Sequence, residues 1–174
     1  MATAYLGLGS NLGDRAAALL TAVSHLTQTP GIELRQLSSI YESAAVDSPA
    51  DAGSFYNMVI EVETSQSPRE LLRTCLSIED RMGRFRPAGI ANAARVIDID
   101  VVAIGDEVIA EPDLLVPHRL MHERHFVLAP LVEIAPDWRH PELRQTSTEL
   151  LLAAESSPQI VRASPILEEA PETS

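Results

Sequence analysis

The stretch "ARVIDIDVVAIGD", Ala94–Asp106, combines the composition of a buried strand with two acidic residues. Its centre, from Val96 to Ile104, is apolar and largely β-branched, which predicts a strand that is at least half buried. Asp98 and Asp100 stand two residues apart in it, so both side chains would lie on one face of the strand. Because a buried, unpaired carboxylate is costly and the two charges repel each other, the pair requires a compensating partner.

Strands and helices follow one another on the N-terminal side of this stretch. Ser67 and Glu70 have the spacing of a capping box, with Pro68 at the first helical position. Alternation and helical spacing predict strands over about 3–8, 32–41 and 55–64, and helices over about 14–29, 68–82 and 148–154. The order strand, helix, strand, strand, helix, strand predicts an α+β, ferredoxin-like split β-α-β sandwich, with a mainly antiparallel sheet and a C-terminal helical extension.

The 174-residue chain is expected to form one domain over residues 1–155 and a disordered tail over 156–174, which is rich in Pro, Ser and Glu. With 25 acidic and 13 basic residues, the net charge is −12, which argues against nucleic acid as the main partner. A small phosphorylated ligand stays possible, because a local cluster of arginines can oppose the global sign.

Several features of the sequence predict a cytoplasmic protein without a membrane partner. The single Cys75 cannot form an internal disulfide and falls in a helical pattern, which indicates a buried structural thiol. No apolar run approaches the roughly 20 residues of a membrane span. The N-terminus lacks the basic region and the cleavage site of a signal peptide.

The stretch "GLGSNLGDR", Gly7–Arg15, has glycines between a predicted strand and a predicted helix. Its spacing, G-x-G-x-x-x-G, differs from the dinucleotide fingerprint G-x-G-x-x-G, and no Lys-Ser or Lys-Thr pair follows as in a phosphate-binding loop. Two interpretations stay open: a tight strand-to-helix turn, or a turn whose backbone approaches a ligand.

The carboxylate pair has two interpretations, a site for a hard cation such as Mg²⁺ or two solvated residues at a sheet edge. Nearby arginines favour the first, because guanidinium groups bind phosphate oxygens bidentately. These arginines are Arg84, Arg86, Arg95, Arg119 and Arg124. Together they predict a site for a metal and a polyphosphate, whereas the alternative is surface ion pairs, with Glu79 as one partner.

Six segments, in order and spacing, resemble the 6-hydroxymethyl-7,8-dihydropterin pyrophosphokinases of folate biosynthesis. They are "YLGLGSNLGDR", "SSIYES", "FYNMVIEVET", "IEDRMGR", "RVIDIDVVAIGDEVI" and "LLVPHRLMHERHFVLAPLVEIAPDW", and the resemblance covers about residues 3–138. It implies a ferredoxin-like fold, two Mg²⁺ ions, ATP as donor and a pterin as acceptor. The chain is expected to act as a monomer on these two small molecules.

The resemblance also implies roles for individual positions. Metal ligands are Asp98 and Asp100, and catalytic residues are Arg84, Arg95, Asp98 and Asp100. ATP-binding positions are Leu72, Glu79, Arg84, Arg86, Arg95, Val101, Leu114, Leu115, His118 and Arg119. Pterin-binding positions are Ser43, Ala44, Val46, Phe55, Asn57, Arg124 and Phe126. The chain departs from the family before Arg95, where an aromatic residue and Gly-Pro are usual and this sequence has "IANAA", with Asn92 in the aromatic position.

The implied reaction is transfer of pyrophosphate from ATP to the pterin hydroxymethyl group, with release of AMP. One alternative is a two-metal nucleotidyltransferase, which also combines Gly-Ser with D-x-D, but here Ser10 and Asp98 are far apart in sequence. Another is a non-catalytic ferredoxin-like domain that binds a small ligand. Release of AMP as a product, rather than its transfer to the acceptor, would distinguish the pyrophosphokinase from the nucleotidyltransferase. Nucleotide binding that does not depend on Mg²⁺ would favour the non-catalytic binding domain.

Overall fold

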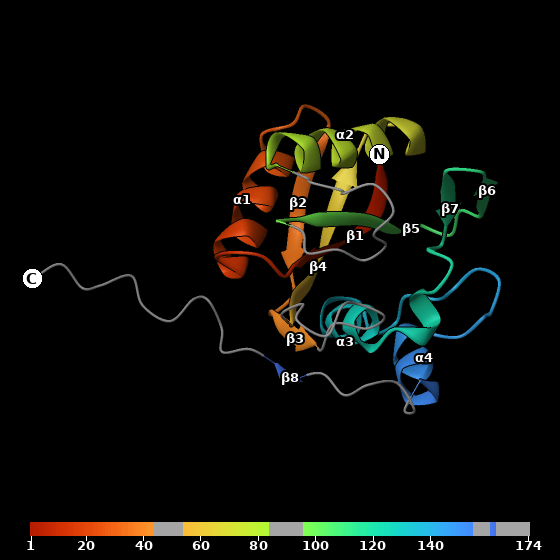
Figure 1. The fold of residues 1–174 in the computed structure, drawn as a ribbon. Coiled ribbons are helices and arrows are strands. Elements are labelled where there is room, and N and C mark those ends of the chain that lie inside the picture. The colour runs from red at the N-terminus through yellow and green to blue at the C-terminus, as the bar shows by residue number, and fades with distance from the viewer. Residues whose placement is uncertain (44–53, 84–95, 155–160, 163–174) are drawn as a thin grey trace, which may run out of the picture.

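The computed structural model of the chain describes residues 1–43, 54–83, 96–154 and 161–162. Eight strands, four α-helices and one 3₁₀-helix lie in these ranges (Figure 1). In chain order they are β1 Ala2–Ser10, α1 Arg15–Thr27, β2 Ile32–Leu37, β3 Tyr41–Ser43, β4 Phe55–Thr64, α2 Pro68–Arg81, β5 Asp98–Ile104, β6 Ile109–Glu111, β7 Leu114–Val116, η1 Met121–Glu123, α3 His125–Ile134, α4 Ser147–Ala153 and β8 Val161–Arg162.

The main sheet is antiparallel, with the order β5-β1-β4-β3-β8 and with β2 also pairing with β4. The prediction of one strand over residues 32–41 is wrong in one respect. This segment forms two strands, β2 and β3, which pair with different parts of β4. Ser38 explains the break. Its backbone N–H still donates to the Val59 carbonyl at 2.9 Å, but the Val59 N–H donates to the Ser38 hydroxyl, also at 2.9 Å, and this hydroxyl donates to the carbonyl of Ser39, so a side-chain oxygen takes the place of one backbone carbonyl in the ladder.

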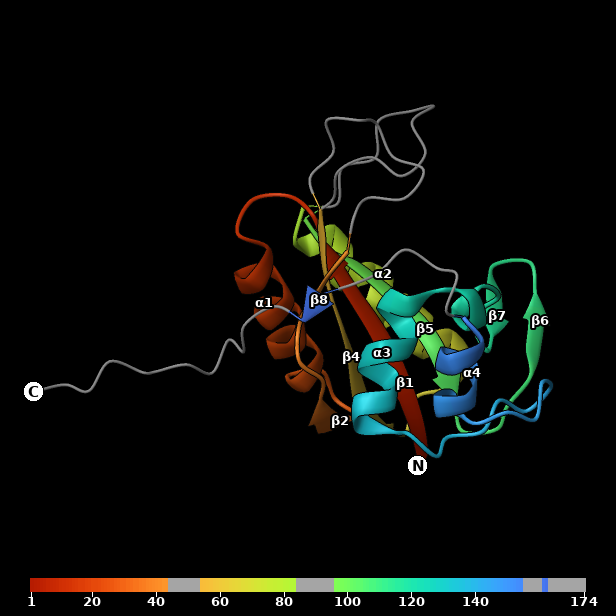
Figure 2. The same cartoon turned by 90° about the horizontal axis from the view of Figure 1, so that it is seen from below.

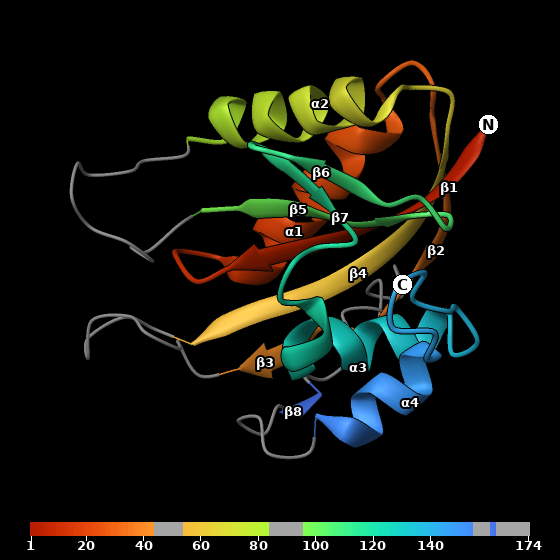
Figure 3. The ribbon, with the colours of Figure 1, turned by 90° about the vertical axis from the view of Figure 1, so that its right-hand side faces the viewer.

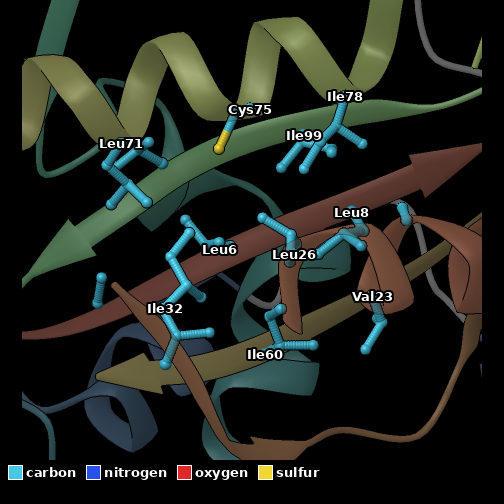
Figure 4. Packing of buried hydrophobic residues seen from close by; sticks show 14 of the residues in the cluster. Leu6, Leu8, Val23, Leu26, Ile32, Ile60, Leu71, Cys75, Ile78 and Ile99 are labelled. Carbon is cyan, nitrogen blue, oxygen red and sulfur yellow. The ribbon is translucent and has the colours of Figure 1, made fainter. Parts of the chain in front are cut away.

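Helices cover both faces of the sheet (Figures 1 and 3). Leu6, Leu8 and Ile60 lie on the face that packs against α1 and α2, where Leu26, Leu71 and Ile78 complete an apolar cluster (Figure 4). Tyr5 and Val59 point to the other face and contact a second cluster from α3 and α4, and Figure 2 shows α3 over β1 and β4. The predicted split β-α-β sandwich with a covering C-terminal extension is confirmed.

The local signals at the helix ends are confirmed as well. Asp14 caps α1, its side chain accepting from the Ala17 N–H at 3.0 Å. Ser67 and Glu70 form the predicted capping box of α2, which carries Pro68 in its first turn. Among the described residues, no helix is long and apolar enough to cross a membrane.

Three of the strands, β6, β7 and β8, were not predicted. Strands β6 and β7 form a separate two-stranded sheet, a hairpin whose turn is Pro112-Asp113. Strand β8 lies in the segment for which disorder is expected, and its residues pair with Tyr41 and Glu42 of β3. The boundary at residue 155 and the disorder of the remaining tail stay predictions.

Candidate active site

Asp98 and Asp100 are half-buried residues of β5, the edge strand next to β1. Ile99, between them, points into the core, so the two carboxylates share the opposite face of the sheet. In register, Asp98 pairs with Gly9 and Asp100 with Gly7 of β1. The interpretation of two solvated aspartates at a sheet edge agrees with the edge position of β5. It agrees less well with the half-buried state of both side chains.

A third carboxylate lies beside this pair. Glu79 of α2 is 2% exposed, and its Oε1 accepts a hydrogen bond from the Ile99 backbone N–H at 2.8 Å. That N–H lies between the two aspartates, so Glu79 fixes the strand that carries them to α2. The contact links residues 20 positions apart in sequence.

The thiol of Cys75 lies close to the same charges. Burial, together with the negative charges of Glu79 and Asp100, raises the pKa of Cys75 to about 12. A thiol with so high a pKa stays protonated and is a poor nucleophile. The prediction of a buried structural cysteine is confirmed.

The donor set at β5 fits magnesium. Among the described residues, no cluster of three or more His, Cys, Asp or Glu side chains could hold a metal ion by itself. Mg²⁺ is commonly bound by one or two carboxylates, and water and substrate phosphates complete its coordination. Two half-buried carboxylates on one strand face match that requirement, so Asp98 and Asp100 are the residues that would hold the ion.

The predicted ATP-binding residues within the described ranges fall into two groups. Leu72, Val101 and Leu114 meet in the apolar cluster beneath α2, with the last two buried. Leu115 points away from that cluster and, with His118 and Arg119, lines a cavity of about 300 Å³ beside the β6–β7 hairpin. The structure therefore does not bring all of these side chains to one surface.

His118 is fixed by two hydrogen bonds. Its backbone N–H donates to the carbonyl of Val102 at 2.8 Å, and its Nδ1 accepts from the Leu120 N–H at 3.3 Å. Burial and the nearby Arg124 guanidinium lower the pKa of His118, whereas Asp98 opposes this shift. The ring is thus neutral at pH 7, and its hydrogen is on Nε2, where it can be donated to an anion.

The predicted pterin side is built on β3 and β4. The Asn57 Nδ2 donates to the Ser43 Oγ at 2.8 Å, and both residues are buried. This leaves the Asn57 Oδ1 as the acceptor of the amide. Phe55 pairs in register with Ser43 and is half-buried.

Gly9 joins the two sides, and the sequence indicated it only as one glycine of the stretch Gly7–Arg15, without its place between the two sides. It pairs with Asn57 of β4 on one side and with Asp98 of β5 on the other, so these residues form one row across three strands. A Cβ at Gly9 would stand 3.2 Å from the Asn57 Oδ1. Gly7 and Gly9 belong to β1, whereas Gly13, with φ of 68°, lies in the turn between β1 and α1, so the stretch does contain a strand-to-helix turn and the approach of its backbone to a ligand stays a prediction.

Arg124 and Phe126 lie at the start of α3. The Arg124 guanidinium carbon is 5.4 Å from the centre of the Phe126 ring, and this arginine also acts on the pKa of His118. Phe126 packs against the cluster of α3 and α4. Arg124 therefore stands near both the nucleotide side and the pterin side of the predicted site.

The remaining predicted site residues, Ala44, Val46, Arg84, Arg86 and Arg95, lie outside the described residues, as does Asn92. Their roles stay predictions.

Comparison with known proteins shows the family of the chain. The family of 7,8-dihydro-6-hydroxymethylpterin-pyrophosphokinases (HPPK) matches residues 5–136. The chain is 46% identical over 137 residues to the 2-amino-4-hydroxy-6-hydroxymethyldihydropteridine pyrophosphokinase of Methylorubrum extorquens, covering 79% of this chain and 85% of that protein. The protein of the same name from Aquifex aeolicus is 40% identical over 149 residues, which are 86% of this chain and 90% of that protein.

A solved structure supports the fold. The Plasmodium falciparum HPPK-DHPS with pterin and p-hydroxybenzoate superposes with a TM-score of 0.70 at 18% identity, over 89% of this chain and 43% of that one. The chain thus spans less than half of that longer protein. With most of its length matched to one family and to relatives that are covered over 85% and 90% of their own length, the chain belongs to the 7,8-dihydro-6-hydroxymethylpterin-pyrophosphokinase family.

Proposed function

We propose that this chain transfers the pyrophosphoryl group of ATP to the hydroxymethyl oxygen of 6-hydroxymethyl-7,8-dihydropterin and releases AMP, in folate biosynthesis. Membership of the family supports the reaction. The structural observation that carries it is the row Asn57–Gly9–Asp98 across β4, β1 and β5. Two strand spacings, roughly 10 Å, separate the ends of this row, which suits a pterin held at one end with its hydroxymethyl arm directed to the other.

The transfer is a displacement at the β-phosphorus of ATP. The hydroxymethyl oxygen forms a bond to that phosphorus, the bond to the oxygen bridging the α- and β-phosphates breaks, and AMP leaves with the bridging oxygen. The hydroxyl proton passes to a carboxylate oxygen of Asp98 or Asp100, or to water. Two Mg²⁺ ions, held by Asp98 and Asp100, would neutralise the triphosphate and lower the pKa of the attacking hydroxyl.

Side chains of the chain orient the two substrates. The Asn57 Oδ1 accepts from the amino edge of the pterin, while its amide nitrogen stays bonded to Ser43. The Nε2–H of neutral His118 donates to a phosphate oxygen of ATP. Glu79 keeps β5 in place through the Ile99 N–H, so that both aspartates present their oxygens in a fixed position. Arg84, Arg86 and Arg95 are proposed to stabilise charge on the transferring group.

The chain is proposed to work as a cytoplasmic monomer on these small molecules. A net charge of −12 opposes nucleic acid as a partner, and ATP is accommodated by local positive charge.

The products distinguish this function from its alternatives. Purified protein is incubated with Mg²⁺, ATP and 6-hydroxymethyl-7,8-dihydropterin, and nucleotides and pterins are identified by mass spectrometry. AMP with pterin diphosphate supports the proposal. An adenylylated pterin with free pyrophosphate would indicate a nucleotidyltransferase, and ligand binding without turnover would indicate a binding domain.

A further inference from the structure

One arginine joins α2 to the turn of the β6–β7 hairpin. The Arg69 guanidinium binds the Asp113 carboxylate through two hydrogen bonds, Nη1 to Oδ2 at 3.0 Å and Nη2 to Oδ1 at 2.8 Å. Its Nη2 also contacts the Glu111 carboxylate. The same interaction holds the pKa of Asp113 below its usual range. We call these three residues, Arg69, Glu111 and Asp113, the Arg69 clamp.

The Arg69 clamp lies next to residues on the proposed nucleotide side. Arg69 precedes Leu72 by three positions, so the two residues share one side of α2. Asp113 immediately precedes Leu114 and Leu115, and Glu111 pairs with Leu114 in the hairpin register. Each half of the clamp therefore belongs to an element that carries a predicted ATP-binding residue.

Within the described residues, the hairpin has few other contacts that hold its turn against α2. It is a separate sheet of two three-residue strands, and an isolated two-stranded hairpin is only marginally stable. Leu114 and Val116 anchor β7 in the core, and the His118 N–H fixes the following turn to Val102. Figure 3 shows the hairpin beside β5 and below α2. The clamp is the contact at the turn end, where bidentate geometry sets both distance and orientation.

We propose that Arg69 is a positioning residue for the nucleotide: by holding Asp113 and Glu111, it fixes the hairpin residues Leu114 and Leu115 relative to Leu72. This inference rests on the proposed function, because it takes the surface between α2 and the hairpin as the nucleotide side. Without the clamp, the hairpin turn moves relative to α2 and ATP binds less tightly. The β5 carboxylates and the pterin row are unaffected, so the chemical step is unchanged.

Two variants remove the clamp and leave opposite charges behind. Arg69→Ala leaves two carboxylates, and Glu111→Ala combined with Asp113→Ala leaves the guanidinium without either acceptor. If the position of the hairpin relative to α2 determines nucleotide affinity, both variants should raise the KM for ATP, roughly three- to tenfold. Their kcat and their KM for pterin should stay within about twofold of wild type. Exchanging the charges, Arg69→Glu with Glu111→Gln and Asp113→Arg, should recover most of the lost affinity.

Arg73 provides the matched control. It lies one turn further along α2, and its charge also acts on Asp113, but the described residues include no hydrogen bond between the two. Arg73→Ala should leave the KM for ATP unchanged. Thermal denaturation of each variant shows that it is folded.

Three results would overturn the inference: an unchanged KM for ATP in both clamp variants, shifts of opposite sign, which indicate long-range electrostatics, or an equal effect of Arg73→Ala. If wild-type protein does not turn over the pterin, the proposed function fails. The clamp is then tested by calorimetric titration of the same variants with a non-hydrolysable ATP analogue and Mg²⁺, where unchanged affinity refutes it.

Discussion

At Gly9, β1 passes between Asn57 of β4 and Asp98 of β5, and the absence of a side chain leaves room beside the Oδ1 of the buried Asn57, where a Cβ would stand 3.2 Å away. At the scale of residues, the sequence indicated which side chains could bind a ligand, but not which of them lie next to one another in the fold. The spacing of Asp98 and Asp100 is local and could be read directly. The row with Asn57 depends on the register of three strands, and the bond from the Ile99 N–H to Glu79 depends on how α2 packs, so neither was visible in the sequence.

Gly9→Ala should weaken pterin binding. The added methyl would stand 3.2 Å from the Asn57 Oδ1 and 3.7 Å from the Phe55 ring, so the amide must shift. Because a buried polar group left without its hydrogen bond costs about 1–3 kcal/mol, we expect the KM for pterin to rise about tenfold or more, whereas the KM for ATP changes little. Gly7→Ala is the control, because its methyl would meet only the Val102 side chain, at 3.2 Å. Equal pterin KM values for Gly9→Ala and wild type would contradict the assignment of Asn57.

The pH dependence of stability should reflect two histidines. Burial is the main cause that lowers the pKa of both His118 and His140 in the folded protein. The unfolded chain, with a histidine pKa of about 6.5, therefore binds more protons at acidic pH. The stability due to the neutral rings is complete above pH 6.5 and is lost as the pH falls through the folded pKa values.

Thermal midpoints measured between pH 8 and pH 5 test this. We expect a decline below about pH 6.5 that is smaller in His140→Gln, which removes one of the two groups. If the thermal midpoint fell equally in His140→Gln and in wild type, His140 would not contribute to the pH dependence of stability.

At the scale of elements, the sequence predicted best where the signals are local. The caps of α1 and α2 and the apolar alternation of β1, β4 and β5 act within a few residues. The break between β2 and β3 was missed because Ser38 is held by Val59, a contact made only after β4 pairs. The β6–β7 hairpin could have been found, since Pro112-Asp113 is a turn signal between two short apolar runs.

Ser67→Ala tests the start of α2. The Ser67 side chain accepts from the Glu70 N–H and stabilises the first turn, so its loss should cost about 1 kcal/mol. For a chain of this size that corresponds to a fall in Tm of roughly 2–4 °C. Ser77→Ala, an exposed position within the same helix, is the control and should leave Tm equal or slightly higher. A fall of the same size in both variants would mean that capping is not the cause.

At the scale of the molecule, two apolar clusters on opposite faces hold one sheet, and the candidate site lies on strands that both clusters fix. The C-terminal segment adds little to this arrangement within the described residues, because β8 contributes only the pairs of Arg162 with Tyr41 and Val161 with Glu42.

Truncation after Ser156 should therefore have a small effect. Two cross-strand pairs are worth less than about 2 kcal/mol together, so Tm should fall by a few degrees at most, with kcat and both KM values unchanged. Differential scanning calorimetry and steady-state kinetics on the truncated chain measure this. A large fall in Tm would show that the segment packs on the body of the protein, and a changed pterin KM would show that it supports β3.

The central claim is that Asp98 and Asp100 on β5 support pyrophosphoryl transfer from ATP. The most direct measurement is a single-turnover reaction of wild type and Asp98→Asn with Mg²⁺, ATP and 6-hydroxymethyl-7,8-dihydropterin, in which AMP and pterin diphosphate are quantified over time. Wild type should form both in equal amounts and only with Mg²⁺. The variant should remain folded but react at least about 100-fold more slowly, since even residues outside the direct ligands of a metal cost up to that factor. Near-wild-type formation of AMP by Asp98→Asn, or formation of ADP by either protein, would contradict the account.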